Sequence, residues 1–197
     1  DKNIYQEAIN YFHTLQSILK KNIFHCYDKN RKEIDVFLED YVYFCLLLIS
    51  LYEINEDENS LKRCSQLLKE TWSFFYDEEN NLLQKNIGKS NDLFVKPIDI
   101  IDNNVPNGNS IFLLVCNKLF NITGDDFWKD KIQTLKKSYH SLINNAYSQM
   151  FSYIKILDIC DKNITFTFHG DNKIFHNIKE KLIKKYFEKA TFIYREN

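Results

Sequence analysis

The chain has 197 residues, with 26 Lys and Arg against 27 Asp and Glu, and its formal net charge is −1. This balance produces no overall field that would attract nucleic acid or a membrane surface, so we expect neither as a partner. With 44% hydrophobic and 15% aromatic residues, the chain can bury one sizeable core.

Five cysteines are scattered along the chain and never follow a CxxC spacing: Cys26, Cys45, Cys64, Cys116 and Cys160. Three of them fall in apolar helical patterns, where Cys behaves as a small buried hydrophobe. We therefore expect a reducing, cytoplasmic location. The apolar run 41–54 is too short to span a bilayer. Because the chain begins at Asp1 and enters a helical pattern directly, we expect it to be a piece of a longer protein.

Motifs that would indicate a cofactor are absent from the sequence. It contains no P-loop, no GxGxxG and no RNA-binding signature. The five histidines show no metal-ligand spacing, so they are predicted to be surface or packing residues: His13, His25, His140, His169 and His176. We expect no cofactor and no metal ion.

The first half of the chain alternates between two kinds of helix pattern. Residues 4–20 carry an apolar stripe and predict an amphipathic helix. Residues 37–54 are apolar nearly all round, which predicts a helix buried on all sides. Asn59 or Ser60 then starts a second amphipathic helix, which ends before the polar turn 77–81.

The second half repeats this alternation. Residues 111–122 predict another helix that is apolar all round, residues 127–144 an amphipathic one, and residues 147–159 a third apolar one. Between the first two, Gly124 is predicted to end one helix and Asp125 to cap the next.

The tail changes character. Residues 164–168 alternate with period two and predict a strand, residues 174–187 predict a helix, and residues 191–194 predict a second strand beside the first. We therefore predict two parts, helical hairpins over 1–160 and a β-α-β cap over 161–197.

The order of the helices predicts two layers, with apolar helices inside and amphipathic helices outside. An α/α toroid has this arrangement, and so does a helical solenoid. Because no tight repeat is visible, we favour a mainly α fold made of hairpins of an (α/α)6 toroid, as a partial ring. In such a ring the loops before Phe37, Ile111 and Tyr147 open on one rim.

The segment 96–110 is the most distinctive stretch of the chain, with both prolines and one of the four glycines. It ends the predicted long loop 82–109 and runs into an apolar helix, so Asn109 or Ser110 is predicted to cap that helix. Gly108 indicates either a positive φ or a close backbone approach. Because long loops in compact domains are usually functional or disordered, we expect this loop to line a site.

Several of these segments resemble a family of thioredoxin-domain-containing proteins that includes YyaL and spermatogenesis-associated protein 20. Residues 37–41 with 51–53 resemble its FLDDYA…LYE motif, and 96–110 resembles its K…DGA-x-PSGNS segment. Residues 119–125 resemble its LxxLTGD, and 166–171 its closing vvivG strand. The chain departs from the pattern at Glu39, Asn103, Asn104 and Asn107.

This resemblance implies the C-terminal portion of a six-hairpin toroid, similar to those of carbohydrate-active enzymes. The family's N-terminal thioredoxin-like domain and the first part of its ring are absent from this chain. The implied partners are a small polar or sugar ligand and the missing N-terminal part of the family's chain.

Two carboxylates are the candidate acid/base groups, Asp40 at the start of a buried helix and Asp102 in the distinctive loop. The candidate substrate-binding residues are Glu39, Tyr41, Lys96, Asn109 and Ser110. Structural alternatives exist for most of them, because an acidic residue also stabilises a helix N-terminus and Asn or Ser also caps one.

A second hypothesis is a non-catalytic helical scaffold, whose apolar helices pack against a missing domain or a second chain. The sequence assigns no reaction, so it leaves open whether the chain is an enzyme.

Overall fold

The structure of the chain is a computed structural model that describes residues 6–7, 9–12, 14, 23, 25, 36–87, 97–98, 100–186 and 189–195. Within the predicted helix 4–20, the described residues 6–7, 9–12 and 14 are helical. Cys26 and the predicted connection 27–32 lie outside the described residues.

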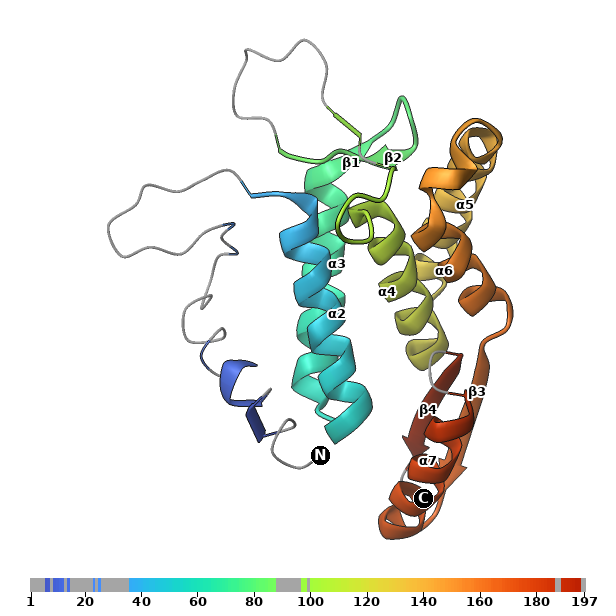
Figure 1. Cartoon of the computed structure of the whole chain (residues 1–197). Helices are drawn as coiled ribbons and strands as arrows, with labels where there is room; N and C mark the ends of the chain where they lie inside the picture. Colours follow the sequence, from blue (N-terminus) through green and yellow to red (C-terminus); the bar gives the residue numbers. More distant parts are fainter. Residues whose placement is uncertain are drawn as a thin grey trace.

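Five long helices form the body of the molecule (Figure 1): α2 (Leu38–Asn55), α3 (Glu58–Phe75), α4 (Gly108–Thr123), α5 (Asp126–Ala146) and α6 (Phe151–Asp161). Helices α2, α4 and α6 begin at the same end of the molecule, and α4 packs between the other two. Helix α3 packs on α2, and α5 packs on α4. This confirms the predicted two layers and the shared rim at the starts of the inner helices.

Helix α2 is buried because nearly every turn presents apolar residues on all sides. Val42, Cys45, Leu48 and Ile49 have no exposed surface. The helix ends where Glu56 adopts a left-handed conformation with φ of 58°, and its backbone N–H donates to Tyr52 O at 2.7 Å. The predicted helix over 37–54 is confirmed to within one residue at each end.

The outer helices start at aspartate caps. Asp125 accepts a hydrogen bond from Phe127 N at 3.0 Å, and Gly124 has a positive φ of 69°, as predicted. The start predicted for α3 was wrong by a few residues. Asp57 is its cap, since its carboxylate accepts bonds from Asn59 N at 3.0 Å and from Ser60 Oγ at 2.6 Å.

The third inner helix differs from the prediction for residues 147–159. A short 3-10 turn, η1 (Tyr147–Gln149), precedes α6 and delays its start. Helix α6 is buried on one side only, because Phe151 is 68% and Ile154 39% exposed. On the inner side of α6, the ring of Tyr153 stacks on the ring of Tyr139 from α5, with 4.0 Å between the ring centroids.

A small hairpin follows α3 and was missed from the sequence, because its strands have only two residues each. Strand β1 (Tyr76–Asp77) pairs with β2 (Leu82–Leu83) in antiparallel register. The turn between them falls at the predicted polar turn, and Asn81 takes a positive φ of 54° there. After the hairpin, the chain runs over the end of the molecule at which the inner helices start (Figure 1).

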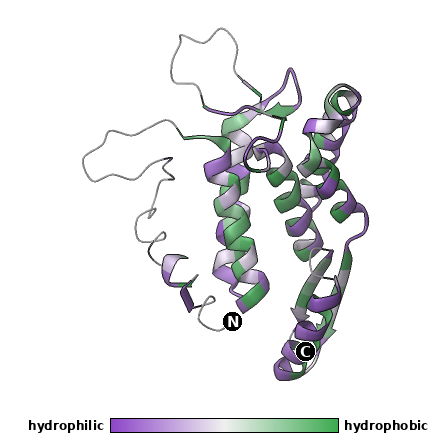
Figure 2. Ribbon diagram, viewed as in Figure 1, coloured by the Kyte–Doolittle hydropathy of each residue, from purple (hydrophilic) through white to green (hydrophobic). Residues whose placement is uncertain are grey.

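The C-terminal part is a β-α-β unit, as predicted, and consists of β3 (Ile164–His169), α7 (Asn172–Tyr186) and β4 (Ala190–Arg195). The strands are parallel, with Ile164 opposite Ala190. Figure 2 shows hydrophobic residues along both strands, whereas the visible side of α7 is mainly hydrophilic. The mainly α class with helical hairpins and a terminal β-α-β element is confirmed.

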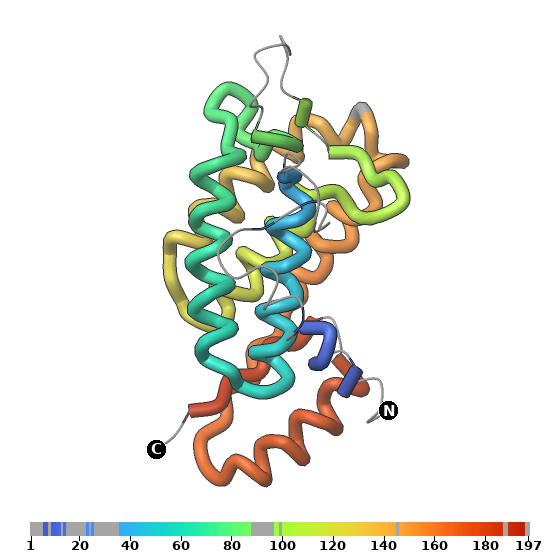
Figure 3. Tube along the Cα trace, turned by 90° about the vertical axis from the view of Figure 1, so that its left-hand side faces the viewer, coloured from blue at the N-terminus to red at the C-terminus, as the bar shows by residue number. Residues whose placement is uncertain are grey.

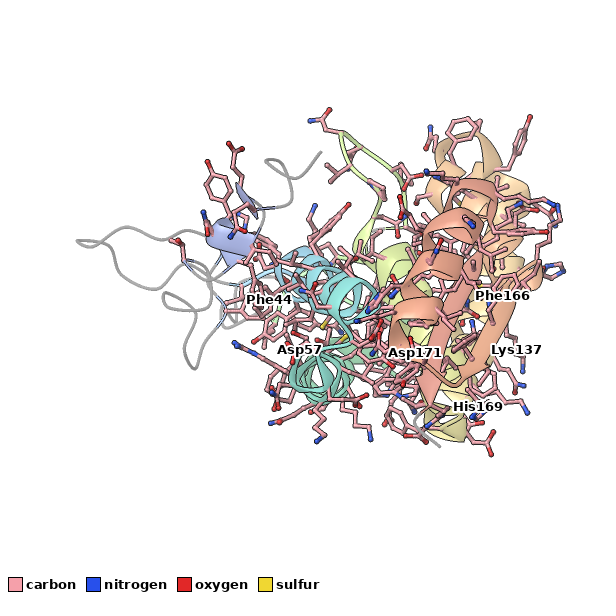
Figure 4. All side chains as sticks on the ribbon, turned by 90° about the horizontal axis from the view of Figure 1, so that it is seen from below. Phe44, Asp57, Lys137, Phe166, His169 and Asp171 are labelled. Carbon is pink, nitrogen blue, oxygen red and sulfur yellow. The ribbon has the colours of Figure 1, made fainter. Side chains whose placement is uncertain are left out.

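Charged contacts fasten this unit to the end of the body opposite the rim. Helix α7 crosses beneath the lower ends of α2 and α3 (Figure 3), and the view from below labels Asp57 and Asp171 at this end (Figure 4). Lys179 Nζ donates to Glu56 Oε1 at 3.3 Å, and Lys189 Nζ donates to Asp158 Oδ2 at 2.5 Å. The predicted division into two domains at residue 160 stays a prediction.

Among the described residues, no helix combines the length and the apolar character that crossing a bilayer requires.

Gly108 is explained by a close approach between α4 and α2. A Cβ atom built on Gly108 would lie 2.8 Å from Leu38 Cγ and 2.9 Å from Leu38 Cδ2. Leu38 is itself only 2% exposed, so it has little room to move. Of the two reasons predicted for this glycine, close approach is therefore correct.

We expect Gly108→Ala to lower the free energy of unfolding by about 1–2 kcal/mol, because the added methyl overpacks the contact with Leu38. In a Leu38→Ala background the same change should instead stabilise the chain, since Ala is the better helix former. Urea unfolding of the four members of this cycle measures both effects. A stabilising Gly108→Ala in the otherwise unchanged chain would contradict the steric explanation.

Candidate functional site

The site predicted from the sequence lies where the loop 100–107 meets the starts of the inner helices. Tyr43 OH, from α2, donates to Pro106 O at 3.0 Å. Asp102 N donates to Gln149 O at 2.8 Å, next to the start of α6. The loop is thus held to both neighbouring inner helices before it enters α4.

Asn107 is the central residue of this junction and is 3% exposed. Its Oδ1 accepts hydrogen bonds from Ser110 N at 3.0 Å and from Tyr139 OH at 2.8 Å. Its Nδ2 donates to Ile100 O at 3.1 Å and to Asp102 Oδ1 at 2.9 Å. Asn107 is therefore the N-cap of α4.

The predicted cap, Asn109 or Ser110, was wrong. Both residues already belong to the helix, which begins three residues before the apolar run at Ile111. The prediction failed because it took the first apolar residue as the first buried one, whereas Gly108, Asn109 and Ser110 are buried as well.

The carboxylate of Asp102 caps α6 across the loop. Its Oδ2 accepts from Ser152 N at 2.7 Å, and its Oδ1 accepts from Asn107 N at 3.1 Å and from the Ser152 hydroxyl. Burial alone would raise the pKa of Asp102, but the hydrogen bonds from Ser152 and Asn107 outweigh it and lower the pKa. We call Asp102, Asn107, Tyr139 and Ser152 the polar knot.

Asp40 occupies the third position of α2 and supports the helix start. Its Oδ2 accepts from Phe37 N at 2.9 Å, and both carboxylate oxygens lie 3.1 Å from His25 Nδ1. The position also suits a negative charge near the positive end of the helix dipole. Asp40 therefore holds the imidazole of His25 at the rim.

The predicted substrate-binding residues have different surroundings. Asn109 is fully buried and its amide clamps the backbone of β2, accepting from Leu83 N and donating to Leu83 O, both at 2.8 Å. Ser110 is fully buried too, with Oγ 3.5 Å from Tyr139 OH. In place of the predicted contact with substrate, the structure gives both a role in the core. Lys96 lies outside the described residues.

Tyr41 packs away from the loop, edge-on against Phe75 at 5.5 Å and against Phe74 at 6.3 Å. Burial raises the pKa of the Tyr41 hydroxyl, and the negative charges of Glu70 and Asp40 add to this effect. Glu39, in contrast, points to the loop side and lines a cleft there.

This cleft, which we call the rim cleft, has a volume of about 390 Å³. Its lining combines a carboxylate, an imidazole, an ammonium group, several amides and one aromatic ring: His25, Phe37, Glu39, Lys85, Ile101, Asn103, Asn104, Val105, Pro106 and Asn107. Asp40 and Asp102 do not line it. Each instead supports a residue that does, His25 and Asn107 respectively.

His25 was predicted to be a surface or packing residue, and the structure agrees, although the sequence did not indicate its contact with Asp40 or its place in the rim cleft. Its ring packs edge-on against Phe37 at 4.5 Å, and its side chain is 45% exposed. It lies 15 residues before Asp40, so no local spacing could have indicated the pair. Within the described part of the chain, no three His, Cys, Asp or Glu side chains gather closely enough to hold a metal ion.

No model of a known protein family matches the chain, and no curated protein matches it. Among solved structures, the chain is similar to an inactive variant of an alpha-1,6-mannanase, GH76A of Salegentibacter sp. HEL1_6, in complex with alpha-1,6-mannotriose. The match has 18% identity and a TM-score of 0.45, and it covers 52% of this chain and 30% of that one.

A glycosyl hydrolase family 88 protein from Bacteroides vulgatus is also similar, with 18% identity and a TM-score of 0.37. This match covers 55% of the present chain and 33% of the other. The chain thus spans about a third of each neighbour.

The polar knot gives a pH-dependent prediction. We expect Asp102→Asn to lower the free energy of unfolding at neutral pH by about 2–4 kcal/mol, because the charge-assisted hydrogen bonds from Ser152 and Asn107 are weakened. Since the folded-state pKa of Asp102 is lowered, this stabilisation is present above the ordinary value of 3.8 and is lost as the pH falls through the lowered pKa. The difference between the two chains should therefore shrink below about pH 4.

Thermal and urea unfolding between neutral and acid pH measures this difference. Asp130→Asn is the matched control, because Asp130 is exposed on α5. A difference between Asp102→Asn and the unaltered chain that stays constant down to acid pH would rule out the charged cap.

Proposed function

We propose that the chain is the C-terminal portion of a YyaL-like protein and forms part of a six-hairpin α/α toroid whose rim binds a small ligand of the carbohydrate class. The rim cleft is the observation that carries this proposal. It lies at the starts of the inner helices, and its volume of about 390 Å³ falls in the range of small-molecule sites.

The chemistry of the lining suits a polyhydroxylated ligand. A sugar hydroxyl both donates and accepts hydrogen bonds, so it needs acceptors and donors close together. Glu39 supplies an acceptor, Lys85 supplies donors, and Asn103 and Asn104 supply both. The ring of Phe37 adds an apolar surface for the C–H face of a sugar.

In this proposal the residues that touch the ligand are Glu39 and His25, and the two aspartates position them. Asp40 fixes the imidazole through Nδ1, which leaves Nε2 as the second ring nitrogen for a ligand. Asp102 fixes the loop wall through Asn107. If the ligand is also turned over, the Asp40–His25 pair and Glu39 are the groups in place to move a proton.

We expect the chain to bind neutral mono- or disaccharides, and expect Glu39→Gln and His25→Ala each to weaken binding at least about tenfold by removing one direct hydrogen bond. Calorimetry or saturation-transfer NMR with a sugar panel measures this. Asp40→Asn should weaken binding less than His25→Ala, because Asp40 does not line the cleft and acts only through the residues that it positions, His25 and Phe37.

Glu58→Gln is the matched control, since Glu58 occupies the first turn of α3 at the opposite end of the molecule and is exposed. It should leave sugar binding unchanged. Wild-type affinity in both Glu39→Gln and His25→Ala, or no binding of any sugar in the panel, would refute the rim cleft as a carbohydrate site.

A second candidate function, a non-catalytic scaffold, is favoured by one specific observation. Phe151 and Ile154 lie one turn apart on α6 and are 68% and 39% exposed, and Tyr147 of the preceding η1 is 65% exposed. This α6 stripe is the kind of surface that another protein element covers. The proposed partner is the missing part of the ring or a second copy of the chain.

The scaffold hypothesis predicts that the chain associates with itself, and that Phe151→Ser with Ile154→Ser reduces this association by removing apolar contact area. Sedimentation velocity over a concentration series measures it. The matched control changes Ile174 and Ile178 of α7 to Ser, because these residues are also exposed, at 55% and 40%. A monomeric chain at all concentrations would count against the scaffold function.

A further inference from the structure

A second cavity lies among the inner helices and the C-terminal unit. Its volume of about 460 Å³ falls in the range of small-molecule sites. Side chains from α2, α4, α6 and β4 form its walls, and the most buried of them are apolar: Ile111 is 4%, Ile156 4% and Phe192 8% exposed. Ile54, which is 50% exposed, lies on its open side. The second cavity is therefore a mainly apolar pocket with access to solvent.

One ion pair lines this cavity. Lys118 Nζ, from α4, lies 2.6 Å from Glu53 Oε1, from α2, and the two side chains are only 18% and 22% exposed. Within the described part of the chain, this contact is the one hydrogen bond that either side chain makes. An ammonium group has three N–H donors, and a carboxylate has two acceptor oxygens. The pair therefore keeps two N–H groups and Glu53 Oε2 for a further partner.

The pair carries no net charge, and the other polar groups of the cavity are engaged or exposed. The Ser50 hydroxyl donates to Leu46 O at 2.8 Å within its own helix, and the Ser152 hydroxyl donates to Asp102. Lys155, the remaining charged lining residue, is exposed, so solvent screens its charge. The buried part of the cavity therefore offers a donor and an acceptor side by side, with no excess of either charge.

This arrangement favours one kind of head group. A group that completes the pair has to accept from an N–H group of Lys118 and donate to Glu53 Oε2, and a hydroxyl does both. A carboxylate can only accept, and it would lie beside the carboxylate of Glu53. A quaternary ammonium can do neither. Either ion would also lose its hydration among apolar walls, with no net countercharge to offset the loss.

We propose that the second cavity binds an uncharged amphiphile, an aliphatic alcohol with one hydroxyl group. The apolar walls take the hydrocarbon chain, and the hydroxyl bonds to both members of the Lys118–Glu53 pair. Because the walls come from the inner helices and from β4, the bound molecule joins the C-terminal unit to the body. This site does not depend on the function proposed for the rim cleft, whose lining is polar.

The test is calorimetry of the 197-residue chain with four probes of similar chain length: octanol, methyl octyl ether, octanoate and octyltrimethylammonium. We expect one octanol to bind per chain, at least about tenfold more tightly than either ion. The ether should bind about fivefold or more weakly than octanol, because it accepts a hydrogen bond but donates none. Hexanol should bind about tenfold more weakly than octanol, since each methylene adds apolar burial.

Single variants of the ion pair should change the preferred head group. Glu53→Gln leaves the charge of Lys118 uncompensated, so octanoate should bind at least about tenfold more tightly than it does to the unaltered chain. Lys118→Gln leaves the charge of Glu53 uncompensated and should have the same effect on octyltrimethylammonium. An ion pair that only supports the fold would not produce these opposite changes in selectivity.

If either single variant unfolds, the Glu53→Leu, Lys118→Met double variant removes both charges together. It should bind octanol and methyl octyl ether equally. The matched control is Lys136→Met with Asp161→Leu, because this pair also joins two helices, at 2.7 Å, and neither residue lines the cavity. The control should keep the preference for octanol.

Leu114 is partly buried and lines the cavity from α4, so Leu114→Trp fills the cavity and should abolish octanol binding. The proposal would be overturned by no binding of octanol, by an ion that binds the unaltered chain as tightly as octanol, or by octanol binding that Leu114→Trp leaves unchanged. An unchanged head-group preference in both single variants would also overturn it. So would a chain dimer that Leu114→Trp dissociates, because the cavity would then be an interface between copies.

Discussion

The arrangement at the rim depends on one constraint, the need to satisfy the first backbone N–H groups of two inner helices that start beside each other. A helix start leaves four such groups without partners, and those buried among neighbouring helices need protein acceptors. The polar knot meets this need for α4 and α6 together. Asn107 caps α4, Asp102 caps α6, and the two side chains bond to each other. The loop between them has little freedom left.

This constraint also decides what the polar residues of the loop can do. A carboxylate that accepts hydrogen bonds from Ser152 and Asn107 stays ionised and occupied, so Asp102 suits a structural role better than proton transfer. Asp40 is likewise occupied, by Phe37 N and His25. The side chains that line the rim cleft, Glu39 and His25 among them, lie on the outer surface of this framework.

Much of the fold could be predicted from the sequence, because helices α2 to α5 bury continuous or striped apolar surfaces whose period is visible along the chain. The predicted β-α-β unit succeeded for the same reason, since ITFTF alternates strictly. Helix starts were less predictable. Asp57 and Asn107 are caps, while neighbouring Asn59, Ser60, Asn109 and Ser110 have the same chemistry and lie inside helices. Only the tertiary contacts of each residue distinguish them.

The sequence indicated the loop that lines the rim cleft, but it did not indicate which polar side chains line the cleft and which cap helices. Residue type alone cannot separate a capping carboxylate from a catalytic one, because both need an ionised oxygen near N–H donors. His25 contacts Asp40, which lies 15 residues later in the chain, and no periodicity in the sequence reveals such a contact.

Pro106 lines both the rim cleft and the second cavity of about 460 Å³, which is also lined by residues of α2, α4, α6 and β4. The Pro106 carbonyl accepts a hydrogen bond from the Tyr43 hydroxyl of α2, and the next residue, Asn107, is held by its hydrogen bond to Asp102 in the polar knot. One short loop therefore shapes two cavities with different linings, a polar one at the rim and a mainly apolar one inside.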